Sequence, residues 1–290
     1  CRELALAALV RPGENGEFSV INPTAQTITA VCTTPLAVPG PVGLYDENGR
    51  AAALLDNRLS GAGQAEVTFL VESLPPFSAR VYRTGAPATG QGPEQISGEG
   101  EMPGGAIIEN RRYRVQADAS GLVAVFDKTL GREILAADGV RPGELILEHD
   151  EGSPWATLYP DQARTSLAPF TRLAAIEKGS GWQRLVFQVD APREMGLSGK
   201  CLRARLAVTL VEGLERVDFN AHVEWDAFNY RLRVAMPVPR LPGMEARHVY
   251  EIPYGMLARQ PYPPEFRWAG PNGDWPAIHW AGIEQPGLSV

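Results

Sequence analysis

Short strand-like segments separated by chain breakers run through almost the whole sequence, and this pattern constrains the fold most. In the first part of the chain, such segments alternate apolar and polar residues or run apolar. They span residues 17–22, 26–33, 65–72 and 77–83. Turn-forming residues separate them, at Asn22-Pro23, Pro39-Gly40-Pro41, Asn48-Gly49 and Pro75-Pro76. Alternation bounded by such breakers is typical of antiparallel strands joined by tight turns. Residues 16–84 are therefore predicted to form a small β-sandwich.

Residues 106–290 continue the same pattern without a convincing helix. Strand signals recur at residues 112–118, 122–127, 144–150, 182–190, 202–213, 215–225 and 230–239. Several of these segments exceed the five or six residues of an ordinary strand. Long strands in an uninterrupted series favour one large two-sheet sandwich over two small ones. The predicted fold class is all-β, with a small β-sandwich followed by a large one.

Two segments lack the strand pattern. Residues 85–105 hold many Gly and Pro and few large apolar residues, so they are predicted to be a linker between the sandwiches. Residues 1–15 are predicted to be the tail of a helix, with apolar residues on one face until Pro12-Gly13 ends it. A chain that starts within a helix suggests a fragment of a longer protein.

Charge and cysteine content argue against several classes of partner. Net charge is −7, from 34 acidic and 27 basic residues, and the basic residues form no stripe interleaved with aromatics. Nucleic acid and anionic membranes are not expected as partners, because both require clustered positive charge. No apolar run approaches the ~20 residues that span a bilayer.

The three cysteines, Cys1, Cys32 and Cys201, are far apart in sequence and form no C-x-x-C pair. This pattern argues against a disulfide framework and a thiolate zinc site, and it favours a cytoplasmic location.

Four stretches, taken in order, resemble one protein family. The most specific is RYRVQADASGLVAVFDKTLGREIL, residues 112–135, where a strand, a Gly turn, an Asp-Lys strand end and a Gly-Arg-Glu turn follow one another. The residues that carry this pattern are Asn110, Tyr113, Val115, Gly121, Asp127, Lys128, Gly131, Arg132 and Glu133. The other matches are FSVINPTAQ, VDFNAHVEWDAFNYRLRVAMPVP, and YEIPYGMLARQ with FRWAGPNG. Together they resemble family 38 of the glycoside hydrolases, the zinc-dependent α-mannosidases.

The resemblance implies an architecture and a division of roles. It implies a small sandwich followed by a galactose-mutarotase-like supersandwich, which in the family continues beyond the point where GIEQPGLSV ends this sequence. In the family, the zinc ligands and the Asp nucleophile belong to an N-terminal α/β domain, which a helical bundle follows. Residues 1–15 would be the tail of that bundle. The resemblance thus implies no catalytic residue and no metal ligand in this chain, with zinc bound by the N-terminal domain of a parent enzyme.

An acidic and aromatic loop is the candidate sugar-binding element. Residues 148–159, EHDEGSPWATLY, combine acidic residues with Trp155 and Tyr159. A pyranose site uses stacking surface together with hydrogen-bonding groups for hydroxyls, and in the family the corresponding loop approaches the sugar cleft. The resemblance therefore makes Asp150, Trp155 and Tyr159 the substrate-binding candidates at the cleft rim. An ordinary loop whose Trp155 plugs the sandwich edge is the alternative interpretation.

Two other polar groups have both a structural and a functional interpretation. His222, Glu224 and Asp226 alternate with apolar residues, which predicts the polar face of a strand. A metal-binding or sugar-facing cluster is the alternative. Residues 254–268 hold aromatic and basic side chains that either line the sugar cleft or pack as a structural Arg–Trp pair. They are Tyr254, Arg259, Arg267 and Trp268.

The expected function is that of the C-terminal, non-catalytic part of a retaining α-mannosidase. The chain would shape one wall of the sugar cleft and stabilise its own N-terminal catalytic domain, so that domain and an α-mannoside carbohydrate are its expected partners. Zinc enzymes of this type often associate, which suggests homo-oligomers. Two other classes stay open. One is a stand-alone carbohydrate-binding module, and the other is a mutarotase-like sugar epimerase or lyase that uses His222 and Glu224.

Overall fold

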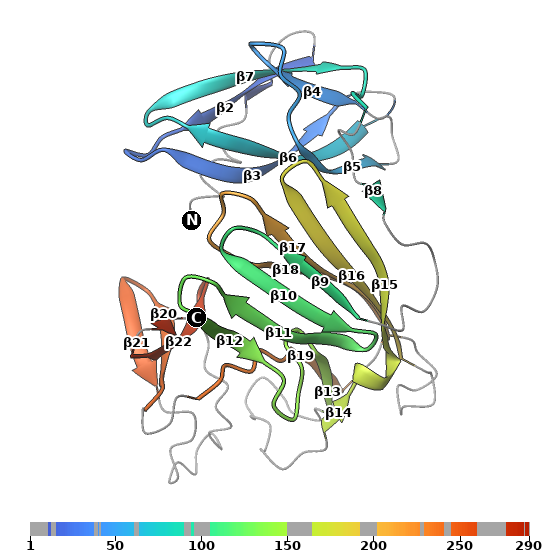
Figure 1. The fold of residues 1–290 in the computed structure, drawn as a ribbon, viewed down its shortest axis with the longest axis vertical. Helices are drawn as coiled ribbons and strands as arrows, with labels where there is room; N and C mark the ends of the chain where they lie inside the picture. Colours follow the sequence, from blue (N-terminus) through green and yellow to red (C-terminus); the bar gives the residue numbers. More distant parts are fainter. Residues whose placement is uncertain are drawn as a thin grey trace.

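The computed structural model describes the chain as two stacked β bodies, the smaller above the larger in Figure 1. The described residues are 11–12, 16–37, 40, 42–60, 64–89, 94–95, 105–149, 164–191, 202–226, 229–240, 245–259, 277–286 and 288–289. Every strand pair within these ranges is antiparallel. In this part of the chain the helical segment is a 3-10 turn, η2 (Ala168–Phe170), and no helix is long and apolar enough to cross a membrane.

The small sandwich consists of two packed sheets. One has the strand order β1-β2-β7-β4 and the other β3-β6-β5. The strands are β1 (Arg11–Pro12), β2 (Glu17–Asn22), β3 (Ile28–Leu36), β4 (Gly43–Asp46), β5 (Leu54–Ser60), β6 (Gln64–Leu74) and β7 (Ser78–Gly85). Phe18, Phe69 and Tyr82, drawn from both sheets, pack ring against ring in the core with centroids 5.0 to 5.7 Å apart. Their alternation with polar neighbours along each strand is what gives the sheets one apolar face.

A buried asparagine fixes the first turn of the small sandwich. Asn22 ends β2 and has no exposed surface. Its Nδ2 donates to the carbonyl oxygens of Gln26 at 2.7 Å and Leu74 at 3.0 Å, and its Oδ1 accepts from the Thr24 backbone N–H at 2.9 Å. Burial of an amide without such partners would be costly, and here the amide is saturated. The INPT stretch is therefore a turn that also ties β2 to the end of β6.

The larger body is built from four antiparallel sheets. Their strand orders are β12-β11-β10-β9, β18-β17-β16-β15-β8, β14-β13-β19 and β21-β20-β22-β23. The first strands are β8 (Glu94–Gln95), β9 (Ala106–Glu109), β10 (Tyr113–Asp118), β11 (Gly121–Asp127), β12 (Arg132–Ala136), β13 (Leu145–His149), β14 (Arg164–Ser166) and β15 (Thr171–Gly179). The remaining ones are β16 (Trp182–Ala191), β17 (Leu202–Val211), β18 (Asp218–Trp225), β19 (Tyr230–Val234), β20 (Arg247–Ile252), β21 (Gly255–Arg259), β22 (Ala281–Gln285) and β23 (Leu288–Ser289).

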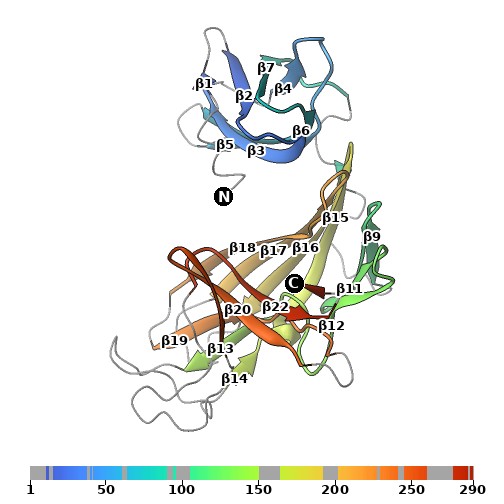
Figure 2. The ribbon, with the colours of Figure 1, turned by 90° about the vertical axis from the view of Figure 1, so that its left-hand side faces the viewer.

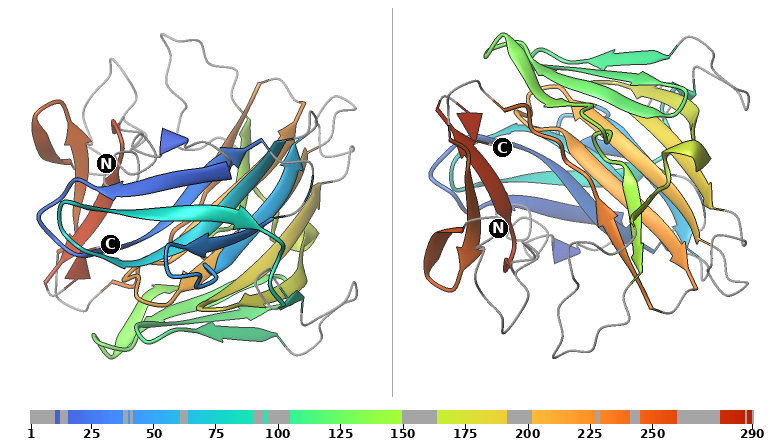
Figure 3. Two further views of the ribbon diagram at one scale, coloured as in Figure 1. Left: turned by 90° about the horizontal axis from the view of Figure 1, so that it is seen from above. Right: turned by 90° about the horizontal axis from the view of Figure 1, so that it is seen from below.

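The five-stranded sheet is the centre of the larger body. Its inner face packs against the sheet of β9–β12, where Val115 and Val125 share a core with Leu185 and Phe187. Figure 2 shows the two sheets facing each other, and Figure 3 shows the same arrangement from below. Because successive residues of a strand point to opposite faces, the neighbours of Leu185 and Phe187 on β16 point to the outer face. That outer face carries the polar side chains described in the next subsection.

The DKTLGRE stretch forms the turn between β11 and β12. The Asp127 carboxylate is buried, and its Oδ1 accepts hydrogen bonds from the backbone N–H groups of Thr129 at 2.8 Å and Leu130 at 2.9 Å. Its Oδ2 accepts another from Arg112 Nε at 3.0 Å. Gly131 closes the turn at φ +67°, a left-handed conformation that glycine adopts at little cost. Turn chemistry thus accounts for the Asp and the Gly of this stretch.

The tip of the β15–β16 hairpin joins the two bodies. Trp182 is 2% exposed and packs with Leu55 and Leu70 of the small sandwich and with Val211 of β17. Its indole Nε1 donates a hydrogen bond to the Leu54 carbonyl oxygen at 3.0 Å. Figure 1 shows this hairpin reaching up to β5 and β6. A buried apolar cluster with a satisfied indole N–H is a specific junction between the sandwiches.

The two segments without a strand pattern differ in part from their predicted state. Gly85, at the start of the predicted linker, completes β7, and β8 within the same segment pairs with β15 at the edge of the five-stranded sheet. The linker therefore contributes a short strand to the larger body. The predicted helix tail 1–15 is wrong for residues 11–12, which pair with β2, because a residue in a strand ladder cannot keep helical hydrogen bonds. Residues 1–10 and 13–15 lie outside the described residues.

Candidate functional site

The three residues predicted to bind substrate lie outside the described residues. Asp150, Trp155 and Tyr159 fall between His149, where β13 ends, and Arg164, where β14 begins. The strands on either side of this segment pair with each other, with Glu148 opposite Arg164. The described residues that flank this segment, on β13 and β14, therefore lie side by side in the β14-β13-β19 sheet.

A buried carboxylate holds the base of that loop in place. The Glu148 side chain is only 4% exposed and forms ion pairs with Arg164 on β14 and Arg233 on β19. Next to it, the His149 ring packs edge-on against Tyr230, with centroids 5.3 Å apart. Removing one partner of so buried an ion pair would leave an uncompensated charge, so Glu148 ties three neighbouring strands together. The sequence placed this residue in the loop with the other acids, whereas its role here is structural.

The polar face predicted for residues 222–226 is present. His222 and Glu224 are exposed on the outer face of β18, while Val223 and Trp225 pack against the core below. Asp226 follows the strand and is also exposed. Among the described residues, no group of three or more His, Cys, Asp or Glu side chains could hold a metal ion. In that part of the chain the residues therefore do not fit a zinc site.

The second predicted group is split by the structure. Tyr254 lies in the turn of the β20–β21 hairpin at φ +66° and is fully exposed, whereas Arg259 lies at the other end of β21, opposite His248. Arg267 and Trp268 lie outside the described residues. The hairpin thus does not bring Tyr254 and Arg259 together.

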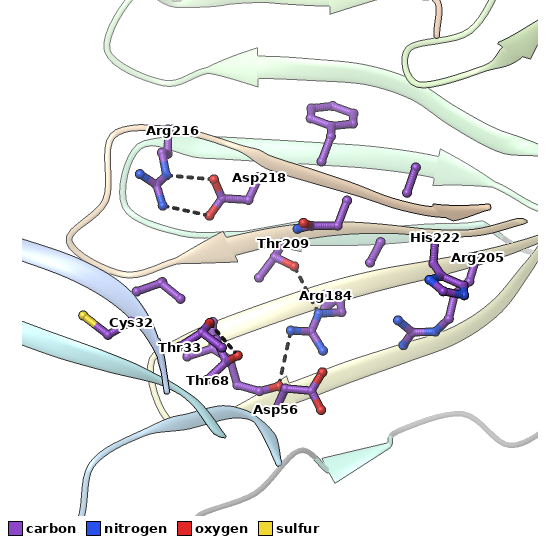
Figure 4. Close-up of a pocket in the computed structure, with 16 residues that line it drawn as sticks. Cys32, Thr33, Asp56, Thr68, Arg184, Arg205, Thr209, Arg216, Asp218 and His222 are labelled. Atoms are coloured by element: carbon purple, nitrogen blue, oxygen red, sulfur yellow. Dashed lines mark hydrogen bonds and ion pairs between the residues drawn. The ribbon is translucent and has the colours of Figure 1, made fainter. Parts of the chain in front are cut away.

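A cleft between the two bodies was not anticipated from the sequence. Its volume is about 640 Å³, and it opens between the outer face of the five-stranded sheet and the β3-β6-β5 sheet of the small sandwich. Thr33 and Thr68 stand on the sandwich side, and their hydroxyl oxygens are 2.9 Å apart. Arg205 and His222 lie at one end of the cleft and the Arg216–Asp218 pair at the other, as Figure 4 shows.

Arg184 is the central side chain of the cleft and also bridges its two sides. Its Nη1 is 2.9 Å from Glu177 Oε2, its Nε donates to Thr209 Oγ1 at 3.1 Å, and its Nη2 donates to the Leu55 carbonyl oxygen at 3.3 Å. Its guanidinium also lies 4.8 Å from the centre of the Trp182 ring. A planar fork of five N–H donors suits such simultaneous contacts, which a lysine could not reproduce. Arg184 therefore connects β15 and β17 of the larger body to β5 of the small sandwich.

The resolved pKa shifts belong to the hairpins of β9–β12 and to the core of the small sandwich. A hydrogen bond from Lys128 lowers the pKa of Glu109, and the hydrogen bond to Asp127 raises the pKa of Arg112. Burial raises the pKa of Tyr113, and it raises the pKa of Tyr82 in the same way. Each shift has a cause in packing or pairing, which indicates a structural role for these groups.

Comparison with known proteins shows the family to which this architecture belongs. The family model described as the C-terminal domain of glycosyl hydrolases family 38 matches residues 108–290. The chain belongs to glycosyl hydrolase family 38. No curated protein matches it.

Two solved structures share the fold. A glycosyl hydrolase family 38 protein from Enterococcus faecalis matches with a TM-score of 0.54 and 15% sequence identity. The match covers 86% of this chain and 35% of the Enterococcus chain. An α-mannosidase from Enterococcus faecalis V583 has a TM-score of 0.56 and 14% identity, covering 92% and 36%. The chain thus spans about a third of the length of these two proteins. The predicted family and the all-β fold class are both confirmed.

Proposed function

We propose that this chain is the C-terminal, non-catalytic part of a retaining α-mannosidase. It would shape one wall of the sugar cleft and stabilise the N-terminal catalytic domain of the parent enzyme. The observation that carries the proposal is the match of residues 108–290 to the C-terminal domain of family 38. The fold it shares with an α-mannosidase, over 92% of this chain but 36% of that protein, supports the same division of roles.

The proposal gives the chain a binding role in a reaction carried out elsewhere. A retaining glycosidase needs two carboxyl groups about 5 Å apart across the scissile bond, and the parent's N-terminal domain would supply its nucleophile and bind zinc. Asp150, Trp155 and Tyr159 would form the rim of the sugar cleft, in a segment that the paired strands β13 and β14 flank. We also propose a cytoplasmic location and homo-oligomers for the parent enzyme.

Hydrolysis of an aryl α-mannoside tests the proposal. The purified chain, shown to be folded by circular dichroism, should give no turnover with or without added zinc. In the parent enzyme, Trp155→Ala should raise KM about tenfold with a smaller change in kcat, because a stacking contact at the rim mainly binds the sugar. Zinc-dependent turnover by the chain alone would overturn the non-catalytic assignment. An unchanged KM in the variant would show that Trp155 does not contact the sugar at the cleft rim.

A further inference from the structure

The cleft between the two bodies has the shape and lining of a small-molecule site. Its volume of about 640 Å³ lies within the range of about 300–1,000 Å³ usual for ligand pockets. Its floor is the outer face of β16, β17 and β18, and its wall comes from β3, β5 and β6. Two domains meet here, and ligand pockets are often found at domain interfaces.

The register of the sheet shapes the floor as a shallow groove. Residues directly opposite each other form rows across the strands, and the central row contains Val186, Ala207 and Asn220. Val186 and Ala207 are short and almost fully buried, whereas Asn220 is exposed. Longer polar side chains form the rows on either side, so the central row lies lower than its neighbours.

The two flanking rows supply polar groups along both sides of the groove. One row consists of Arg184, Thr209 and Asp218, and the other supplies Arg205 and His222 to the cleft. Residues two apart along a strand are about 7 Å apart, so the two rows lie about 13 Å from each other. That span is longer than a single phosphate or carboxylate group requires. It suits an extended ligand with polar groups along both edges.

The charges in the cleft are balanced, which argues against a simple anion. Arg184 and Arg205 share the carboxylate of Glu177, at 2.9 and 3.2 Å, and Arg216 Nε is 2.7 Å from Asp218 Oδ1. An anion that entered would have to compete with these carboxylates for the guanidinium groups. A neutral ligand that both donates and accepts hydrogen bonds meets no such competition.

The remaining polar side chains can both donate hydrogen bonds to the hydroxyl groups of a ligand and accept hydrogen bonds from them. Asn220 offers an amide donor and acceptor, Thr33 and Thr68 offer hydroxyls, and the His222 ring offers one donor and one acceptor when neutral. We propose that this cleft binds a neutral oligosaccharide of about two sugar units, seated across β16–β18 beneath the small sandwich. This inference does not depend on the proposed mannosidase role.

Calorimetric titration of the folded full chain tests the inference. The probes are α-1,2-mannobiose, maltose and cellobiose, three neutral disaccharides, with inorganic phosphate as the anionic comparison. Asn220→Ala and His222→Ala remove exposed side chains that line the groove, so both variants should keep the fold. Arg83→Ala is the control variant remote from the cleft. Its side chain is 61% exposed and pairs with Glu17, and both residues lie on the β1-β2-β7-β4 sheet, which does not line the cleft.

The expected result is saturable binding of at least one disaccharide, which either groove variant weakens at least fivefold and Arg83→Ala leaves unchanged. Backbone NMR signals of Thr33, Thr68 and Asn220 should shift with the same titration curve. Three results would overturn the inference: no saturable binding of any of the three sugars, binding that both groove variants retain, or phosphate that binds more tightly and displaces the sugar. None of these bears on hydrolysis by the parent enzyme, so this inference and the proposed function fail separately.

Discussion

Replacing Trp182 with alanine should uncouple the two bodies. The indole is 2% exposed, packs with Leu55, Leu70 and Val211, and donates a hydrogen bond to the Leu54 carbonyl oxygen at 3.0 Å. Removal of a buried Trp or Phe side chain from such a cluster costs about 3–5 kcal/mol, through lost apolar contact and the cavity that remains. Trp182→Phe keeps most of the packing and loses the hydrogen bond, so it should cost about 1–3 kcal/mol.

Urea unfolding followed by circular dichroism measures both losses, through the shift in midpoint. Because the chain has two bodies, the Trp182→Ala transition should also broaden or split as the small sandwich unfolds separately. Trp280→Ala is the matched control, because that side chain is 45% exposed and its removal should change stability by less than about 0.5 kcal/mol. A Trp182→Ala loss no larger than that of Trp280→Ala would refute the idea that this cluster joins the bodies.

Three further predictions test the turns and the buried phenols. Gly179→Ala should lower the free energy of unfolding in urea by about 1–3 kcal/mol, because the new Cβ would lie 2.3 Å from Trp182 Nε1. An unchanged urea midpoint would contradict the close packing of this hairpin. Asp127→Ala should lower the free energy of unfolding by about 3 kcal/mol, because it leaves two turn N–H groups and the Arg112 guanidinium without the acceptor that Asp127 provides. A loss below about 1 kcal/mol would contradict this prediction. Burial raises the pKa of Tyr82 and Tyr113. The contribution of these two phenols to stability should therefore be constant below about pH 10 and fall above it, as the unfolded chain releases phenol protons that the folded chain retains. Absorbance titration should find at least two of the eight tyrosines ionising late, and eight that titrate together near pH 10 would contradict it.

Several strands could be located from sequence because their alternation is regular. Residues 17–22 were predicted as a strand and form β2 with the same bounds, and 182–190 nearly coincides with β16. In contrast, β15 was missed. Its pairing with β16 shifts register between Leu173 and Ala175, so a bulge interrupts the alternation that would have revealed it. Short β4, with four residues, carries too little pattern to stand out.

The candidate site was less predictable than the fold. The polar face at His222 and Glu224 follows from alternation on one strand, and the sequence anticipated it. The cleft above that face did not appear in the sequence, because its lining comes from six strands spread between residues 31 and 222. Nothing in the order of Thr33, Arg184 and Asn220 along the chain indicates that they share one space.

The all-β class and the family could be inferred from the amino-acid sequence alone, because both depend on local features. Alternation sets which face of each strand is apolar, and turn chemistry such as that of Asp127 and Gly131 repeats wherever the same turn is built. The way in which the two sandwiches meet could not be inferred in this manner and is seen in the folded chain alone. That junction depends on Trp182 and Arg184 reaching carbonyl oxygens of Leu54 and Leu55, more than a hundred residues earlier in the chain. Backbone carbonyls are present at every position, so only the folded arrangement selects which of them become partners.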